Sequence, residues 1–161
     1  MILVLDSSAL ITLARIGRLH LLRGFADEVV IPHAVYDEVV RRGSGRPGQT
    51  EIAHASWISH RRIRDRAARG RLETELGHGE AEAIVLAKEL AADFVILDDA
   101  RARQIAESQG LRVTGLLGLL LLAKERGLVE AVKPVLDEMV NAGFYVADAV
   151  YQDVIDAAGE S

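Results

Sequence analysis

The chain of 161 residues is half hydrophobic and 27% charged, which is the size and balance of one globular domain and excludes disorder over most of its length. It has no cysteine, which excludes disulfides, thiolate metal sites and a cysteine nucleophile. The net charge of −5 is unevenly distributed, because residues 41–71 hold nine arginines and two acids, a local charge of +7, whereas the rest carries −12.

The N-terminus predicts a buried strand followed by a helix. Ile2–Leu5 is wholly apolar and ends at a polar residue, Asp6, as expected of a strand in the middle of a sheet. Ser7 or Ser8 can cap the helix that follows. The start of the chain has neither the basic region nor the length of a signal peptide, so we expect a cytoplasmic protein.

A second strand is predicted at Val29–Ile31, after a short helix from Arg18 to Arg23. Pro32 ends this strand, and the spacing of valines predicts a helix from about His33 to Arg42. Residues 43–48 match the glycine spacing of dinucleotide-binding loops, but they follow a helix rather than a strand and contain proline. We therefore interpret them as a flexible loop.

The middle and end of the chain predict two further strands and several helices. The strands are Phe94–Leu97 and Leu111–Thr114. Gly77–Gly79 is predicted as a break before a long helix. The predicted helices are 51–57, 63–72, 80–91, one that ends at Gly110, 116–124, 128–141 and 147–157.

This alternation of strands and helices predicts a three-layer α/β/α sandwich around a parallel sheet, with ligands beyond the carboxyl ends of the strands. We expect one main domain over residues 1–145. Residues 146–161 would form a C-terminal helix that packs on this domain or contacts a partner. No apolar run approaches the length of a membrane span, so no membrane association is expected.

Acidic residues stand where the predicted strands end. Asp6 and the pair Asp98-Asp99 directly follow two strands, and the carboxyl ends of parallel strands meet at one edge of a sheet. Glu80 begins the helix that leads back to the Phe94 strand, so it can join the same edge. Glu82 would point to a different side and is the weaker candidate.

A group of carboxylates without Lys or Arg beside them raises its own pKa values, so such a group is usually kept for a cation. Oxygen ligands select Mg²⁺ or Mn²⁺, and these ions commonly serve phosphate-ester hydrolysis. Other chemistries lack their motifs, since the chain has no nucleophile elbow, phosphate-binding loop or zinc-protease helix. His78 lies close to Glu80 in sequence and could touch a substrate.

Four segments in order carry a resemblance to the PIN-domain ribonucleases, in particular VapC-type toxins or a close branch. The segments are Asp6-Ser7-Ser8, Ile31-Pro32 with Val35–Val39, Gly79–Ile84 and Ile96–Asp99. The resemblance covers about residues 1–145. It implies the PIN fold and a divalent-metal-dependent endoribonuclease that acts as the toxin of a type II toxin-antitoxin pair.

The resemblance also assigns site residues. It implies that Asp6, Glu38, Glu80 and Asp98 form an acidic quartet that binds Mg²⁺ or Mn²⁺, with Asp6, Glu80 and Asp98 as the direct ligands. Glu82 competes with Glu80, and Asp99 can replace or assist Asp98. A hydroxyl of Ser7 or Ser8 would support the site.

The resemblance implies an RNA substrate, a homodimer and a small antitoxin protein that blocks the acidic groove. The RNA contacts expected beside the acids are Ser7, Arg61, Arg62 and Arg64. The arginine-rich segment is either a solvated helix face or a polyanion-binding surface. The alternative function is a non-catalytic module with this fold that binds nucleic acid or protein, in which the acids are ordinary helix caps and strand ends.

Overall fold

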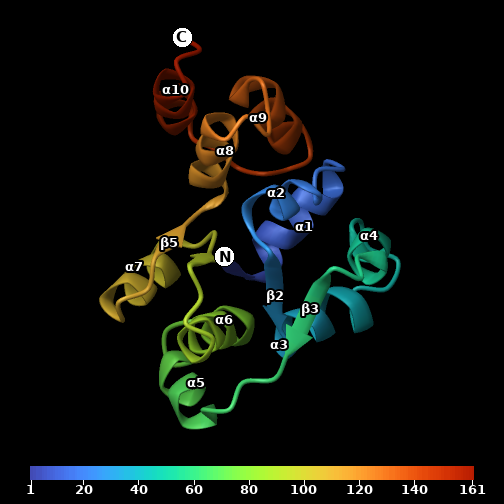
Figure 1. Ribbon diagram of the computed structural model, residues 1–161, viewed down its shortest axis with the longest axis vertical. Coiled ribbons are helices and arrows are strands. Elements are labelled where there is room, and N and C mark those ends of the chain that lie inside the picture. Colours follow the sequence, from blue (N-terminus) through green and yellow to red (C-terminus); the bar gives the residue numbers. More distant parts are fainter.

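The computed structural model, which describes residues 1–161, contains one parallel five-stranded sheet in the order β3-β2-β1-β4-β5 (Figure 1). The central position of β1 is predicted by its apolar sequence and is confirmed, since β1 pairs with β2 on one side and β4 on the other. The strands are β1 (Ile2–Leu5), β2 (Glu28–Pro32), β3 (Ile58–Arg61), β4 (Phe94–Ile96) and β5 (Val113–Thr114).

Helices cover both faces of this sheet, which confirms the predicted three-layer α/β/α class. None of them has both the length and the apolar character needed to cross a membrane. The helices are α1 (Ser7–Arg15), α2 (Leu21–Phe25), α3 (His33–Tyr36), the π-helix η1 (Asp37–Arg41), α4 (Gln49–His54), α5 (Arg66–Leu72), α6 (His78–Glu89), α7 (Ala100–Ser108), α8 (Leu116–Glu125), α9 (Val132–Asn141) and α10 (Asp148–Ala157).

Successive residues of the strands face two separate hydrophobic cores, because side chains alternate between the faces of a sheet. Leu3 and Leu5 pack with α1, α2 and the C-terminal helices α8 to α10. Val4 packs with α6 and α7 on the opposite face. Both faces of the sheet are therefore buried, which explains why the central strands are continuous hydrophobic runs.

The strand β3 is missing from the sequence-based prediction, which assigns its surroundings to helices 51–57 and 63–72. The structure ends α4 at His54 and begins α5 at Arg66, with β3 between them. Only Ile58 of this strand is partly buried, and Ser59 to Arg61 are exposed. β3 forms because its backbone pairs with β2 at the edge of the sheet, and an edge strand with polar side chains has no apolar pattern to reveal it.

Several predicted boundaries are corrected at helix ends. Asp6, not Ser7 or Ser8, caps α1, and α6 begins at His78, directly after Gly77, rather than at Glu80. The short second helix lies at 21–25 instead of 18–23. Helix ends depend on which side chain reaches the free N–H groups, and the tertiary surroundings decide that.

The predicted helix from His33 to Arg42 is divided into α3 and the π-helix η1. In η1 the N–H of Arg42 bonds the carbonyl of Asp37, five residues back, which widens the last turn. The chain leaves η1 through Gly43. Only glycine fits there, because a Cβ at this position would lie 2.1 Å from the carbonyl oxygen of Val39. The wider turn sets the position of Glu38, which is exposed at its outer face.

The C-terminal helices α8, α9 and α10 lie together at one end of the molecule (Figure 1). Val154 and Ile155 of α10 join the core that contains Leu3 and Leu5 of β1. The carboxylate of Glu160 accepts hydrogen bonds from the N–H groups of Val132 and Lys133, at the start of α9, and from the ammonium of Lys124. Glu160 therefore connects the end of the chain to α8 and α9.

We expect Glu160→Gln to lower the melting temperature at pH 7. The two backbone N–H groups and Lys124 lower the pKa of Glu160 to about 2. Because folding lowers this pKa, the ionised Glu160 stabilises the folded protein fully above the usual glutamate pKa of 4.5. This stabilisation is lost as the pH falls from 4.5 toward 2. Thermal unfolding from pH 2 to 7 should show the two proteins converging at low pH. Glu125→Gln, an exposed glutamate of α8, is the control, and an equal effect there would contradict the assignment.

Candidate functional site

Asp6 occupies the centre of the sheet edge where the strands end. It follows β1, is only 3% exposed, and caps α1 by accepting a hydrogen bond at 3.0 Å from the N–H of Ala9 to its Oδ1. Its other oxygen, Oδ2, accepts the N–H of Asp98 at 3.3 Å. The end of β1 is therefore tied to the end of β4, as expected for neighbouring parallel strands.

Asp98 and Asp99 follow β4 and have different surroundings. Asp98 is half-buried, and its Oδ2 accepts a hydrogen bond from the hydroxyl of Ser8 at 3.2 Å. Asp99 is exposed and caps α7 through a hydrogen bond at 2.9 Å from the N–H of Ala102. Both acids thus follow β4 at the same edge as Asp6, and Ser8 is the serine that contacts Asp98.

Glu80 and Glu38 face a common cavity of about 540 Å³. Glu80 lies in the first turn of α6, and its Oε2 atom is buried without a hydrogen-bond donor. Glu38 comes from η1, and its Oε2 atom would lie 3.5 Å from a Cβ placed on Gly79. Gly79, the neighbour of Glu80 in sequence, therefore lies next to the carboxylate of Glu38.

The electrostatics link these carboxylates into one group. Burial raises the pKa of Asp6 to about 6, with a further contribution from the charges of Asp98 and Glu80, against the opposing hydrogen bonds from backbone N–H groups. Burial also raises the pKa of Glu80, and the charges of Asp99, Glu38 and Asp98 add to that shift. None of the five acids forms an ion pair with Lys or Arg elsewhere in the chain.

The donor set fits a divalent cation by its chemistry. All candidate donors are carboxylate oxygens, one of them is buried without a partner, and their mutual repulsion would be relieved by a positive ion. As the side chains lie, however, no three Asp, Glu or His residues already form a metal-ligand cluster.

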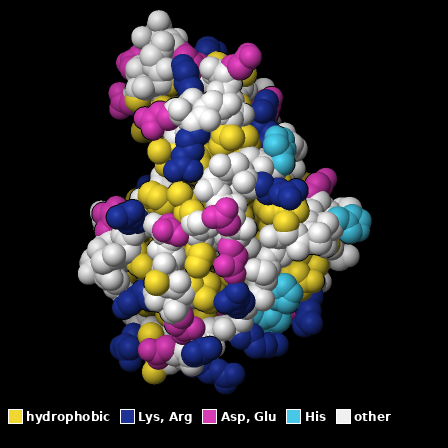
Figure 2. Space-filling model, in the orientation of Figure 1, with side chains coloured by type: hydrophobic (Ala, Val, Ile, Leu, Met, Phe, Trp, Pro, Cys, Tyr) yellow, Lys and Arg dark blue, Asp and Glu magenta, His cyan; other side chains and the backbone are white.

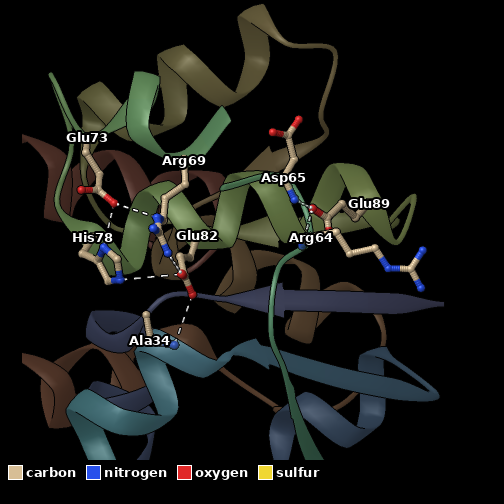
Figure 3. Close-up of polar contacts among 8 residues, drawn as sticks. All are labelled: Ala34, Arg64, Asp65, Arg69, Glu73, His78, Glu82 and Glu89. Carbon is tan, nitrogen blue, oxygen red and sulfur yellow. Dashed lines mark hydrogen bonds and ion pairs between the residues drawn. The ribbon is translucent and has the colours of Figure 1, made fainter. Parts of the chain in front are cut away.

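Glu82 of α6 faces Arg69 of α5 and Ala34 of α3 (Figure 3). It is only 5% exposed and is already bonded, because its carboxylate accepts the guanidinium of Arg69 at 2.9 Å and the N–H of Ala34 at 3.3 Å. His78 contacts Glu73 at 2.7 Å and approaches Glu82 at 3.6 Å. This network fixes α5 against α6 and α3, which gives Glu82 a structural role.

We expect Glu82→Gln to lower the free energy of unfolding by about 1–3 kcal/mol, since it leaves the Arg69 guanidinium without its buried charged partner. Glu80→Gln, two residues earlier on the same helix, removes a carboxylate repelled by its neighbours and should not destabilise the protein. Urea unfolding of the pair at pH 7 measures the difference. Equal destabilisation by both substitutions would contradict the separation of roles.

The predicted RNA-contacting residues are dispersed around the acids. Ser7 lines the cavity of Glu38 and Glu80. Arg61 is paired with Glu28 at 2.7 Å, on the edge strand β3. Arg62 lines a smaller adjoining cavity, whereas the side chain of Arg64 points away from it (Figure 3).

Three arginines near the acids are missing from the sequence-based prediction. Arg42 and Arg46 line the cavity of Glu38 and Glu80. The guanidinium of Arg103 donates hydrogen bonds to the carbonyls of Leu97 and Asp98, at 3.1 and 2.7 Å, and so holds the segment that carries the acids. The position of Arg103, about one helical turn after the Asp98-Asp99 pair, is the sequence signal that could have found it.

Comparisons with known proteins identify the family to which this architecture corresponds. The model of the DUF3368 family, described as a PIN domain, matches residues 2–160. A solved structure of a PilT N-terminus domain protein from the hyperthermophilic archaeon Sulfolobus solfataricus P2 is 16% identical, with a TM-score of 0.48 over 91% of this chain and 98% of the other. No curated protein matches the sequence.

Proposed function

The chain belongs to the PIN-domain family, whose fold is generally that of a nuclease, and we propose that it is a divalent-metal-dependent endoribonuclease. The observation that carries the proposal is the group of carboxylates around buried Asp6, which lies at the carboxyl ends of β1 and β4. Burial raises the pKa values of Asp6 and Glu80, and the charges of the neighbouring carboxylates add to both shifts.

Asp6, Glu80 and Asp98 would hold Mg²⁺ or Mn²⁺, with Asp99 able to replace or assist Asp98. A divalent ion in this position supplies positive charge that stabilises the phosphate as it is attacked. Ser8 fixes the carboxylate of Asp98 through its hydroxyl. Glu38, which is exposed and lines the same cavity as Glu80, would orient the attacking water and accept its proton.

The proposed biological role is that of the toxin in a type II toxin-antitoxin pair, acting as a homodimer. A small antitoxin protein would then cover the acidic edge, and a basic side chain of this partner would compensate the carboxylates. The proposal rests on family membership together with the unpaired acids, which offer a cationic partner a binding site.

The deciding experiment is cleavage of a mixed RNA pool by the purified protein with Mn²⁺ or Mg²⁺, beside a sample containing EDTA. We expect defined RNA fragments with either ion and intact RNA with EDTA. A thermal-shift titration of the same protein should show stabilisation that grows with ion concentration, because the ion binds the folded state. Cleavage unaffected by EDTA would contradict the proposed chemistry.

A non-catalytic binding module is the second candidate. It is favoured by the side-chain arrangement, in which no three acids already stand as metal ligands, and by the arginines beside Glu80. Such a module would bind RNA or a protein without stabilisation by Mn²⁺ and without cleavage. Ion binding in the thermal-shift titration therefore discriminates between the two candidates even where the correct RNA substrate is missing from the pool.

A further inference from the structure

A second cavity, richer in arginine, lies beside the one that Glu38 and Glu80 line. It has a volume of about 240 Å³ and is enclosed by α3, α5, the start of α6 and the segment around Arg62. Only two of its ten lining residues are hydrophobic. Its wall holds four arginines, two histidines and two acids, namely Arg42, Arg62, Arg66, Arg69, His33, His78, Asp37 and Glu82.

The positive charges in this wall are not all compensated. Arg69 is paired with Glu82 and Glu73, and Arg42 is paired with Asp37 at 3.2 Å. The side chains of Arg62 and Arg66 are exposed and form no ion pair or hydrogen bond with the rest of the chain. Two guanidinium groups therefore remain available to an anion.

This cationic cavity adjoins the acidic site. Arg42 and His78 line both cavities, so they form the shared wall between the free arginines and the carboxylates of Glu38 and Glu80. In Figure 2, Lys and Arg side chains gather at the lower end of the molecule, where Figure 1 places α5. A strand that crosses the acidic site can therefore reach the free arginines directly.

We infer that the cavity bounded by Arg42, Arg62 and Arg66 binds a backbone phosphate of the RNA strand, next to but distinct from the phosphate that is cleaved. The inference rests on the proposed nuclease function, whose substrate it anchors. Guanidinium groups match phosphate oxygens in geometry and charge. Only two of the ten lining residues are hydrophobic, so we expect the interaction to be with the backbone and independent of sequence.

The test is RNA binding by protein that cannot cleave. Asp98→Asn protein in Mg²⁺ is titrated against a fluorescent, unstructured RNA oligonucleotide at several salt concentrations, with and without the added pair Arg62→Gln and Arg66→Gln. We expect the pair to weaken binding about tenfold or more, as is typical when charge-assisted hydrogen bonds are removed. The slope of log affinity against log salt should become shallower by about 0.7, because one phosphate of the single strand is no longer neutralised.

Arg71→Gln is the control, because Arg71 is an exposed arginine of the same segment that lines neither cavity. It removes the same charge from the same segment and should leave the slope unchanged. Thermal unfolding verifies that all variants are folded. Equal losses of affinity from Arg71→Gln and from Arg62→Gln or Arg66→Gln, each tested alone, would indicate that binding depends only on overall charge and would overturn the inference. An unchanged salt slope in the double variant would also overturn it.

The outcomes separate this inference from the proposed function. If wild-type protein cleaves RNA while the double variant binds RNA normally, the nuclease stands and the phosphate site is wrong. If wild-type protein does not cleave in any divalent ion but the double variant has weaker binding and a shallower slope, the phosphate site stands and the nuclease is wrong. Failure of the Asp98→Asn protein to bind any RNA overturns the phosphate site.

Discussion

Asp98→Asn is expected to reduce RNA cleavage by about 1,000-fold or more, because the charge stabilisation that a bound divalent ion supplies is worth several kcal/mol of the barrier. Asn keeps the size of the side chain and can still accept the Ser8 hydroxyl, but it removes one negative charge from the group around Asp6. Single-turnover cleavage of one RNA fragment at saturating Mn²⁺ measures the effect. The same variant should lose most of the Mn²⁺-dependent rise in melting temperature.

The pair Glu80→Gln and Glu82→Gln provides the matched control for this result. Both substitutions remove one carboxylate from α6, but Glu80 faces the acidic cavity, whereas Glu82 is bound to Arg69. We expect Glu80→Gln to lose cleavage and Glu82→Gln to retain it once the folded fraction is taken into account. If Glu82→Gln abolishes cleavage in fully folded protein and Glu80→Gln does not, the assignment of the site residue on α6 is wrong.

Asp6→Asn is expected to raise the free energy of unfolding by about 2 kcal/mol at pH 7.5 in metal-free protein. Burial raises the pKa of Asp6 from 3.8 to about 6, and a shift of that size corresponds to about 3 kcal/mol of unfavourable charge burial at neutral pH. Asn retains the cap on the Ala9 N–H but loses the bond from the Asp98 N–H, which offsets part of the gain.

The pH dependence of stability follows from the raised pKa of Asp6. A raised carboxyl pKa means that the folded protein binds more protons than the unfolded chain between pH 3.8 and about 6. Wild-type stability should therefore fall, relative to Asp6→Asn, as the pH rises through this window, and the difference should be constant above it. Urea unfolding at pH 4, 5, 6 and 7.5 with EDTA measures the curve.

Asp99→Asn is the matched control. Asp99 also follows a strand and caps a helix, but it is exposed, whereas Asp6 is buried. Its effect should remain within about 0.5 kcal/mol at every pH. If wild-type protein and Asp6→Asn have equal free energies of unfolding at pH 7.5, the buried charge of Asp6 does not destabilise the fold and the prediction is wrong. Saturating Mn²⁺ should reverse the order, because only the wild-type acids bind the ion well.

The relation of sequence to site is clearest at the acids themselves. Asp6 and Asp98 directly follow apolar strands, and parallel strands must end at one edge of their sheet, so their proximity was predictable. The separation of Glu80 from Glu82 was predictable as well, because residues two apart on a helix point in different directions. Ligand geometry was not predictable, and the structure leaves the acids short of a complete metal cluster.

The cationic cavity illustrates what the sequence leaves open. The sequence shows nine arginines between residues 41 and 71, but it does not indicate which of them are paired. Glu28 neutralises Arg61 only because β3 pairs with β2, and Glu82 neutralises Arg69 only because α5 packs on α6. These ion pairs leave Arg62 and Arg66 free, and no local pattern contains that information.

Local patterns in the chain are sufficient for the α/β class, the central place of β1 and the acids at the ends of β1 and β4, because hydrophobic runs and strand ends are local properties. The edge strand β3, the π-helix that carries Glu38, and the division of the arginines into paired and unpaired ones emerge only when the chain is folded. Each of these depends on backbone pairing or charge interactions set by the folded surroundings, and such interactions have no periodicity in the sequence.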